Sequence, residues 1–292
     1  MLAAATREGR RLRIGDDLTA SGLDRILEHD PGDLTCTVES GVRLSELRTA
    51  LAAAGQRLSL DPPGDPTVGA LLARNVSGPL RHRFGAPRDL VLGVTLVLAD
   101  GTIASAGGKV VKNVAGYDLA RLVCGSEGRL AFIARASFRL LPLPKASQTV
   151  VVETDDAATV VHALLGSQLQ PSALDVLQPG RVAVLFEGSD SAVTAQLDAA
   201  LRLVGGAATD RAVWDESRRR QGASCGHVRF VPCELGAVLE TLNDAVLRPA
   251  AGVGYPTGEA RHNVSQGAPH AAVEQLVEAI RAQLDPNRVL AA

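Results

Sequence analysis

The order of predicted helices and strands indicates an α+β protein of two domains. Apolar and polar residues alternate at 34–38, 91–98 and 130–140, as expected for strands with one buried face. The stretch Leu141-Pro-Leu-Pro144 then breaks the pattern and marks a boundary. Beyond it, helices and strands follow in a different order. We therefore expect domains at 1–144 and 145–292.

The first domain is predicted to contain two subdomains, at about 1–55 and 56–144. The first has a helix at 2–8, strands at 11–14 and 34–38, and a helix at 44–51 that ends at Gly55. The second starts with the irregular stretch 61–66, and Thr67 caps a short helix that runs to Leu72. Strands at 91–98 and 102–105 flank the turn Asp100-Gly101. A helix at 117–123 and a strand at 130–140 follow.

The second domain is predicted to be an α/β cap. Strands are expected at 148–153, 172–177, 181–187 and 227–231, and helices at 156–167, 191–204, 234–246 and 270–284. The segment 214–221 suggests a polar connector, and 252–258 is a glycine-rich stretch. This order favours an antiparallel sheet with helices on one side.

Composition excludes several functional classes. The 292 residues carry a formal net charge of −2, and no basic stripe points to nucleic acid. The four cysteines are scattered without a Cys-x-x-Cys pair, which argues against an iron–sulfur or zinc site in this chain. No signal peptide or apolar run of membrane-spanning length occurs. We expect a cytoplasmic protein with reduced thiols.

The segment from Pro62 to Gly78 is a candidate binding loop. A threonine and glycines at a loop-to-helix junction direct several backbone N–H groups toward one point, as in sites for phosphate or a polarised cofactor oxygen. Asn75, Ser77 and Gly78 add short polar groups and permit close approach. Taken alone, the segment is also consistent with an ordinary proline-rich loop and helix cap.

A second candidate is the run from Gly107 to Ile133. Its turn Gly125-Ser-Glu-Gly128 leads into a buried strand and can hold a ligand against the backbone, because glycine accepts positive φ. The alternative is a helix C-cap followed by a hairpin turn. Lys109, Lys112 and Asn113 precede the turn and are equally consistent with solvated loop charges.

Together these motifs resemble the flavoprotein family named after vanillyl-alcohol oxidase, which has the PCMH-type FAD-binding fold. The similarity covers roughly residues 20–144. The matching segments are Pro63-Gly-Asp-Pro-Thr-Val-Gly69, Ala73-Arg-Asn-Val-Ser-Gly78, Arg83-Phe-Gly-Ala-Pro-Arg-Asp-Leu-Val-Leu-Gly93, Lys112-Asn-Val-Ala-Gly-Tyr-Asp-Leu119 and Gly125-Ser-Glu-Gly-Arg-Leu-Ala-Phe-Ile133. The version from Gly107 to Leu119 and the ending Leu284-Asp-Pro-Asn-Arg-Val-Leu290 are similar to FAD-binding subunits of bacterial glycolate oxidases.

This resemblance implies FAD held without a covalent bond between two subdomains, with a cap over the flavin ring. Residues 63–69 and 75–78 would line the diphosphate, ribityl and ring region, and Glu127, Gly128 and Ile133 would lie near the adenine and ribose side. The implied cofactor-binding residues are Pro63, Gly64, Asp65, Thr67, Val68, Gly69, Asn75, Ser77, Gly78, Glu127, Gly128 and Ile133.

The chain departs from the family pattern in its first glycine-rich loop. The corresponding segment, Leu12–Thr19, keeps only Gly15, and Asp16 and Asp17 would place negative charge near a diphosphate. FAD binding would then be weak, completed by a partner chain, or lost. The segment also lacks a His or Cys that could attach flavin covalently. Asp65-Pro66 and Ala70 replace glycines in the second loop.

The resemblance implies an FAD-binding subunit of a glycolate oxidase-like complex that oxidises a small 2-hydroxy acid. A larger flavin-containing subunit and an iron–sulfur subunit would complete it, at the inner face of the membrane. One alternative is a non-catalytic assembly subunit with an eroded flavin site, and another is an independent flavin oxidase. No catalytic residue is assigned, although Arg229, Tyr255, Arg261 and His262 could meet a carboxylate.

Overall fold

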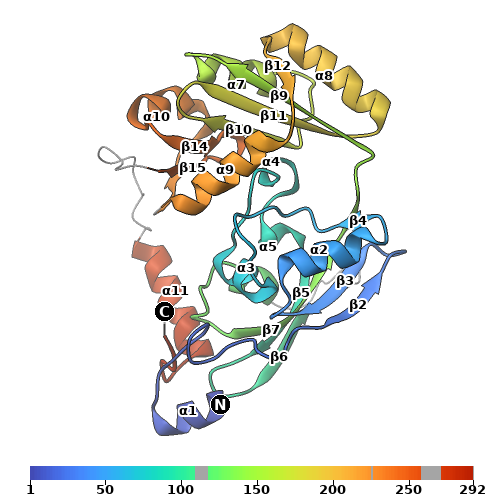
Figure 1. The fold of residues 1–292 in the computed structure, drawn as a ribbon. Helices are drawn as coiled ribbons and strands as arrows, with labels where there is room; N and C mark the ends of the chain where they lie inside the picture. Colours follow the sequence, from blue (N-terminus) through green and yellow to red (C-terminus); the bar gives the residue numbers. More distant parts are fainter. Residues whose placement is uncertain (109–117, 225, 258–270, 292) are drawn as a thin grey trace.

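The computed structural model describes residues 1–108, 118–224, 226–257 and 271–291. Two lobes lie one above the other, and both chain ends lie on the lower lobe (Figure 1). Each lobe contains an antiparallel sheet with helices packed against it. The predicted α+β class, with two lobes, is therefore confirmed.

A five-stranded antiparallel sheet forms the lower lobe, in the order β2-β3-β7-β5-β6. Its strands are β2 (Ile26–Asp30), β3 (Thr35–Glu39), β5 (Val91–Val97), β6 (Ile103–Gly107) and β7 (Phe132–Arg139). The lobe also contains the helices α2 (Leu44–Ala52), α3 (Val68–Arg74), α4 (Arg81–Phe84), α5 (Pro87–Leu90) and α6 (Leu119–Val123).

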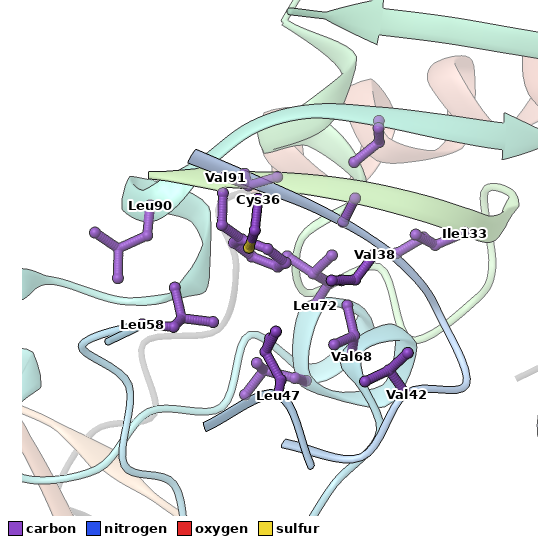
Figure 2. Packing of buried hydrophobic residues seen from close by; sticks show 14 of the residues in the cluster. Cys36, Val38, Val42, Leu47, Leu58, Val68, Leu72, Leu90, Val91 and Ile133 are labelled. Atoms are coloured by element: carbon purple, nitrogen blue, oxygen red, sulfur yellow. The ribbon is translucent and has the colours of Figure 1, made fainter. Parts of the chain in front are cut away.

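The core of the lower lobe lies between α2, α3 and the sheet (Figure 2). Leu47 from α2 and Leu72 from α3 are fully buried, and they pack with Val38 from β3 and Ile133 from β7. Leu47 recurs at helical spacing with Leu44 and Leu51, so local periodicity predicted the buried stripe of α2. In β7 both Phe132 and Ile133 are buried, in separate clusters, so strict alternation does not hold there.

The sheet joins the two expected subdomains. Strand β3, from the first, pairs with β7, from the second, and the hydroxyls of Thr37 and Ser137 lie 2.8 Å apart across this pair. The expected subdomain boundary near residue 55 therefore does not separate two sheets, because strands from both sides of it belong to the same sheet. Strand β2 was not predicted, because Ile26–Asp30 lacks alternation and its side chains are largely exposed.

The chain termini meet on the lower lobe. Strand β1 (Leu12–Arg13) pairs in parallel with β16 (Leu290–Ala291), and both follow helices, α1 (Leu2–Glu8) and α11 (Ala271–Leu284). Leu12 and Leu290 are buried with Leu2. The expected second domain, 145–292, therefore returns its last residues to the first lobe, since these apolar residues find their burial there.

The upper lobe is a seven-stranded antiparallel sheet in the order β12-β9-β11-β10-β14-β15-β13. The strands are β9 (Ala146–Glu153), β10 (Ala173–Leu177), β11 (Arg181–Gly188), β12 (Ala207–Thr209), β13 (Val228–Arg229), β14 (Ala245–Arg248) and β15 (Val253–Pro256). One face is covered by α7 (Ala157–Leu165), α8 (Asp190–Val204) and α10 (Leu235–Thr241). The other face packs on α9 (Ala212–Ala223) and on Leu80 beside α4.

Two expectations for the upper lobe were wrong. The connector at 214–221 is part of helix α9, whose buried stripe includes the polar residues Ser217 and Gln221 and so concealed the helical period. The helix expected at 234–246 ends at Thr241, and β14 begins at Ala245. The glycine-rich stretch contains β15. Short β-segments, β4 (Gln56–Arg57) and β8 (Leu141–Pro142), pair at the junction of the lobes.

Candidate functional site

A cavity of about 340 Å³ lies beside helix α3, and we call it the α3 cavity. Its walls come from the segment after β1, the end of β3, α3, and the turn that precedes β7. The volume is within the range of small-molecule sites, roughly 300–1,000 Å³. The lining residues are Ile14, Gly15, Leu18, Ala20, Ser40, Thr67, Gly69, Ala70, Ala73, Arg74, Glu127, Gly128, Ala131, Phe132 and Ile133.

The start of α3 forms one wall of the α3 cavity. Thr67 caps the helix as predicted, and its hydroxyl accepts a hydrogen bond from the N–H of Ala70 at 3.3 Å. The N–H of Gly69 donates to the carbonyl of Ser40 at 2.8 Å. A Cβ atom on Gly69 would lie 3.0 Å from the Cβ of Ser40, so glycine permits this close approach.

Two polar side chains at the α3 cavity are suited to an anion. The Ser40 hydroxyl is buried, and it has no hydrogen-bond partner among the described residues. Arg74, in the last turn of α3, is exposed and lines the same cavity. A free hydroxyl donor and a guanidinium are both good partners for phosphate oxygens.

The turn at 125–128 is held against the end of α3. The N–H of Gly125 donates to the carbonyl of Leu72 at 3.0 Å, and that of Glu127 to the carbonyl of Ala73 at 2.8 Å. Gly128 has a φ of +78°, and a Cβ atom there would lie 3.1 Å from the Cβ of Ile14. A side chain at this position would therefore be strained and would narrow the cavity.

The structure brings some of the predicted site residues together and separates others. Thr67, Gly69, Glu127, Gly128 and Ile133 all line the α3 cavity. Pro63 and Gly64 instead line a cleft between the lobes. Asp65 faces α2, where its carboxylate accepts hydrogen bonds from the N–H and the hydroxyl of Ser45, both at 2.8 Å.

The remaining predicted residues have structural positions. Val68 is buried in the core of the lower lobe. Asn75 ends α3 with a φ of +50°, and its side-chain oxygen accepts the N–H of Arg88 at 3.2 Å. Ser77 is buried, and its carbonyl accepts a hydrogen bond from the side chain of Gln221. Gly78 packs directly on the backbone of Asp61.

Sequence reasoning missed Ser40 and Arg74. The only signal for Ser40 was its place at the end of a predicted strand, before Gly41, and Arg74 stood inside a motif as an unassigned residue. Asp16 and Asp17 were expected to put negative charge in the site, but Gly15 lines the α3 cavity and they do not. The Asp17 carboxylate accepts the N–H of Arg13 at 2.8 Å.

A second cavity, of about 750 Å³, lies between the lobes, and we call it the interdomain cleft. It shares no lining residue with the α3 cavity. Its lower wall comes from α2, β4 and the loop 60–64, and its upper wall from α9. The lining residues are Arg48, Ala52, Gln56, Arg57, Leu58, Leu60, Asp61, Pro62, Pro63, Gly64, Leu80, Leu143, Arg211, Asp215, Arg218, Arg219 and Gly222.

Asp61 links the loop at 60–64 to the cap. Its carboxylate accepts the N–H of Leu80 at 3.0 Å and pairs with Arg218 of α9 at 3.3 Å. Burial raises the pKa of Asp61 to about 6, although Arg248, the Leu80 N–H and Arg218 oppose the rise. The carboxyl group therefore titrates close to neutral pH.

A buried polar network lies beside Asp61 on the cap. Arg248 and Asp175 are almost completely buried and form an ion pair at 3.3 Å. The hydroxyl of Ser217 donates to Asp175 at 2.5 Å. Arg248 also donates to Gln221 at 2.8 Å, and Gln221 in turn donates to the carbonyl of Ser77 in the lower lobe. The network connects the two lobes at this point.

Several residues considered from the sequence are not assigned to a site. The ring of Tyr255 packs against the guanidinium of Arg248, whose Cζ lies 5.0 Å from the ring centroid. Arg229 lies on the short strand β13. Lys109, Lys112, Asn113, Arg261 and His262 lie outside the described residues. Within the described ranges, no group of His, Cys, Asp and Glu could hold a metal ion, and no helix could cross a membrane.

Residues 17–107 match the protein family described as the FAD binding domain. This range includes the end of β3, all of α3, and the Ser40 and Arg74 side chains at the α3 cavity. The chain carries an FAD-binding domain. This match supports FAD as the cofactor of the domain, and the turn at 125–128 lies just beyond the matched range.

Relatives extend the similarity beyond the FAD-binding domain. The chain is 33% identical over 218 residues to the glycolate oxidase subunit GlcE of Escherichia coli K12, covering 71% of this chain and 61% of that protein. It is 34% identical over 168 residues to the glycolate oxidase subunit GlcD of Bacillus subtilis 168, covering 56% of this chain and 36% of that protein. The chain thus spans less than two thirds of either relative.

Solved structures support the fold of both lobes. Alkyldihydroxyacetonephosphate synthase superposes over 99% of this chain and 72% of its own, with a TM-score of 0.71 and 14% sequence identity. At this identity the likeness concerns the fold alone. It shows that the two lobes occur together in a known fold.

The residues at the α3 cavity fit the diphosphate part of FAD. The unpaired Ser40 hydroxyl and the Arg74 guanidinium are donors to phosphate oxygens. Gly69 and Gly128 line the same cavity, where an added Cβ atom would press on Ser40 and Ile14, respectively. These four residues line the same cavity as Gly15, the one glycine in the segment that corresponds to the first glycine-rich loop of the family.

Proposed function

We propose that this chain is the FAD-binding subunit of a glycolate oxidase-like complex that oxidises small 2-hydroxy acids. The supporting observation is the α3 cavity, where a serine hydroxyl without a partner and an arginine meet two glycines inside the FAD-binding domain. The match to the FAD-binding domain supports FAD as the cofactor, and the glycolate oxidase relatives support the class of reaction.

The extent of similarity favours a glycolate oxidase subunit over other flavoproteins. The match to GlcE covers 71% of this chain, whereas the match to the yeast mitochondrial D-lactate dehydrogenase covers 56%. A match of 218 residues is longer than the first lobe, so it must include part of the cap. Because one fold hosts many functions, a match that includes the cap is more informative than a match to the FAD-binding domain alone.

In this proposal Ser40 and Arg74 bind the diphosphate, and Gly69 and Gly128 admit it to the backbone. Bound FAD would accept the hydride that a 2-hydroxy acid loses on oxidation. Pro63, Gly64, Asp65, Val68, Asn75, Ser77 and Gly78 would then shape the loop and helix rather than contact phosphate. Glu127 and Ile133 would line the end of the α3 cavity nearest β7.

We also propose partner chains. A larger flavin-containing subunit and a separate iron–sulfur subunit would receive the electrons, since this sequence contains no Cys-x-x-Cys pair. The complex would lie in the cytoplasm, at the inner face of the membrane. GlcE and GlcD are each named as subunits of glycolate oxidase, which supports an assembly of several chains.

A second candidate is an assembly subunit whose flavin site no longer functions. The observation in its favour is the segment Leu12–Thr19, which forms a tight turn and lines the α3 cavity with Ile14, Gly15 and Leu18 instead of a row of glycine amides. This wall supplies apolar contacts where a diphosphate needs donors.

The absorption spectrum of the purified chain and a titration with FAD decide between the two candidates. We expect the absorption bands of oxidised flavin and a dissociation constant of about 1 µM or tighter, near −8 kcal/mol. Arg74→Gln should weaken FAD binding about tenfold, because it removes a charge-assisted hydrogen bond. Arg202→Gln, on the exposed side of α8, should leave the affinity unchanged.

The opposite result would favour the assembly subunit. In that case the protein is colourless, FAD does not bind at about 1 mM, and Arg74→Gln has no effect. Co-purification with a larger flavin subunit and an iron–sulfur subunit then tests assembly by itself. Activity toward glycolate and D-lactate in the reconstituted complex tests the substrate class.

A further inference from the structure

The interdomain cleft contains more guanidinium groups than carboxylates. Five arginines line it, Arg48 and Arg57 from the lower lobe and Arg211, Arg218 and Arg219 from α9, together with the two aspartates Asp61 and Asp215. One further carboxylate, that of Glu187, binds Arg57 from outside the lining through two hydrogen bonds of 2.9 and 2.8 Å. Even with Glu187 included, the cleft has an excess of positive charge.

The excess positive charge belongs to Arg48, Arg211 and Arg219, which are not paired with a carboxylate in the described part of the chain. Arg218 is shared between Asp61, at 3.3 Å, and Asp215, at 2.5 Å. Arg48 donates only to the carbonyl of Leu60, at 2.8 Å. In the described part of the chain, Arg211 and Arg219 have no hydrogen-bond or ion-pair partner. These three groups are therefore available to an anion.

Burial and charge act together on Arg48. Burial lowers the pKa of this half-buried guanidinium, and repulsion from Arg218 lowers it further, whereas Asp61 and Asp65 raise it. Like charges at a partly buried position repel each other unless an anion lies between them. The guanidinium groups of Arg48 and Arg218 thus repel each other, and an anion bound between them would reduce this repulsion.

The geometry of α9 concentrates the charge on the cleft. Positions 211, 215, 218, 219 and 222 lie on one face of the helix, because they recur at spacings of three and four. Gly222 ends this face against the loop of the lower lobe, where an added Cβ would lie 3.3 Å from the Cβ of Pro63. The two walls therefore meet at one end and leave the arginine-lined part open.

We propose that the interdomain cleft is a second binding site, separate from the flavin site, for a small organic anion with at least two carboxylate or phosphate groups. Arg48 would bind one group from the lower lobe, and Arg211 and Arg219 another from the cap. The apolar residues Ala52, Leu58 and Leu143 would contact the body of the ligand. The cleft volume of about 750 Å³ suits a molecule of this size.

Because its ligand would contact both lobes, the site would couple their relative position to anion concentration. Asp61 already holds Arg218 at the same cleft and belongs to the loop that precedes Thr67 at the α3 cavity. This inference does not depend on the proposed enzymatic function, because the two cavities share no lining residue.

Calorimetric titration of the whole chain tests the site, with citrate and inorganic pyrophosphate as separate probes at constant ionic strength. We expect at least one probe to bind with a dissociation constant of about 1 mM or tighter. Citrate binding alone identifies a carboxylate site, and pyrophosphate binding alone a phosphate site. Arg219→Gln and Arg211→Gln, both at exposed positions, should each weaken binding about tenfold.

The control is Arg202→Gln, which removes the same charge from α8, outside the cleft. It should leave the affinity within about twofold of the unchanged protein, since exposed charges at a distance are screened. Arg48→Lys keeps the charge but loses the planar guanidinium, and it should weaken binding from the lower lobe. FAD affinity, measured in parallel, should be the same in all four variants.

Two outcomes would overturn the proposal. The first is that neither probe binds with a dissociation constant below about 10 mM. The second is that Arg202→Gln weakens binding as much as the cleft variants do, which would indicate a general effect of net charge. A loss of FAD binding with intact probe binding would instead count against the proposed function and leave this site standing.

Discussion

Single residues at the junction of the lobes are constrained by their neighbours rather than by their own secondary structure. Gly78 is the clearest case, because a Cβ atom there would lie 1.8 Å from the carbonyl oxygen of Asp61. Neither backbone can move freely, since the N–H of Leu80 also donates to the Asp61 carboxylate. The close approach of two loops therefore requires glycine at this position.

We expect Gly78→Ala to destabilise the protein by roughly 3 kcal/mol or more, because the clash is with backbone. Thermal or urea unfolding measures the loss. Gly226→Ala is the matched control, since an added Cβ there meets nothing within 4 Å. Equal stability of the two variants would contradict the structural reason given for Gly78.

Asp61 should make stability depend on pH in a specific direction. Its pKa is raised to about 6 on folding, so the folded state binds this proton more tightly than the unfolded state does. The contribution of Asp61 to the free energy of unfolding therefore falls as pH rises from about 4 to about 6. The total change is roughly 3 kcal/mol, at about 1.4 kcal/mol per pH unit.

Asp61→Asn should remove this contribution. Urea unfolding of both proteins between about pH 4 and 7 gives the comparison, and the variant should gain stability relative to the original protein as pH rises. Parallel curves for the two proteins would show that Asp61 titrates normally in the folded state.

At the scale of elements, α3 is a short helix whose position depends on its two ends. The Thr67 cap fixes its start, and the bonds from Gly125 and Glu127 fix its last turn. A helix of this length is not stable by itself, so its packing on the sheet and its caps decide its orientation. The α3 cavity depends on that orientation.

Thr67→Ala should cost about 1 kcal/mol of stability through loss of the cap. Because α3 also forms a wall of the flavin site, FAD affinity should fall as well. Thr194→Ala on the exposed side of α8 is the control, and it should change stability by less than about 0.5 kcal/mol. If stability falls while FAD affinity stays the same, α3 does not position the cofactor.

At the scale of the whole molecule, contacts between distant parts of the chain hold the fold together. The C-terminal strand β16 pairs with β1, and the Asp285 carboxylate accepts the N–H groups of Val289 and Leu290, each at 2.8 Å. In the same way, Gln221 of the cap reaches Ser77 of the lower lobe. The first lobe is therefore completed by the last residues of the sequence.

Leu290→Ala should destabilise the protein by roughly 2–5 kcal/mol, because the side chain is fully buried. The loss should appear first as increased proteolysis near the N-terminus, where Leu2 and Leu12 lose their contact. Leu276→Ala on α11, where the leucine is 60% exposed, should have little effect. Similar protease sensitivity of both variants would argue against this packing.

Much of the fold was predictable because its signals are local. Leu44, Leu47 and Leu51 recur at helical spacing, and parts of the strands at 91–97 and 132–139 alternate, so a window of a few residues contains much of the information. Helix α9 was missed because its buried stripe includes Ser217 and Gln221, whose partners Asp175 and Ser77 are distant in sequence. Burial of polar groups depends on such partners.

The sequence by itself determined the fold class, the FAD-binding motifs and the position of Thr67 as a cap. Only the tertiary structure decided which predicted residues share a cavity, because Thr67 and Glu127 are brought together by the packing of α3 on the turn at 125–128. It also decided that the Ser40 hydroxyl has no hydrogen-bond partner among the described residues and that arginines from both lobes line one cleft. These properties depend on distances between segments, which periodicity and spacing along the chain do not encode.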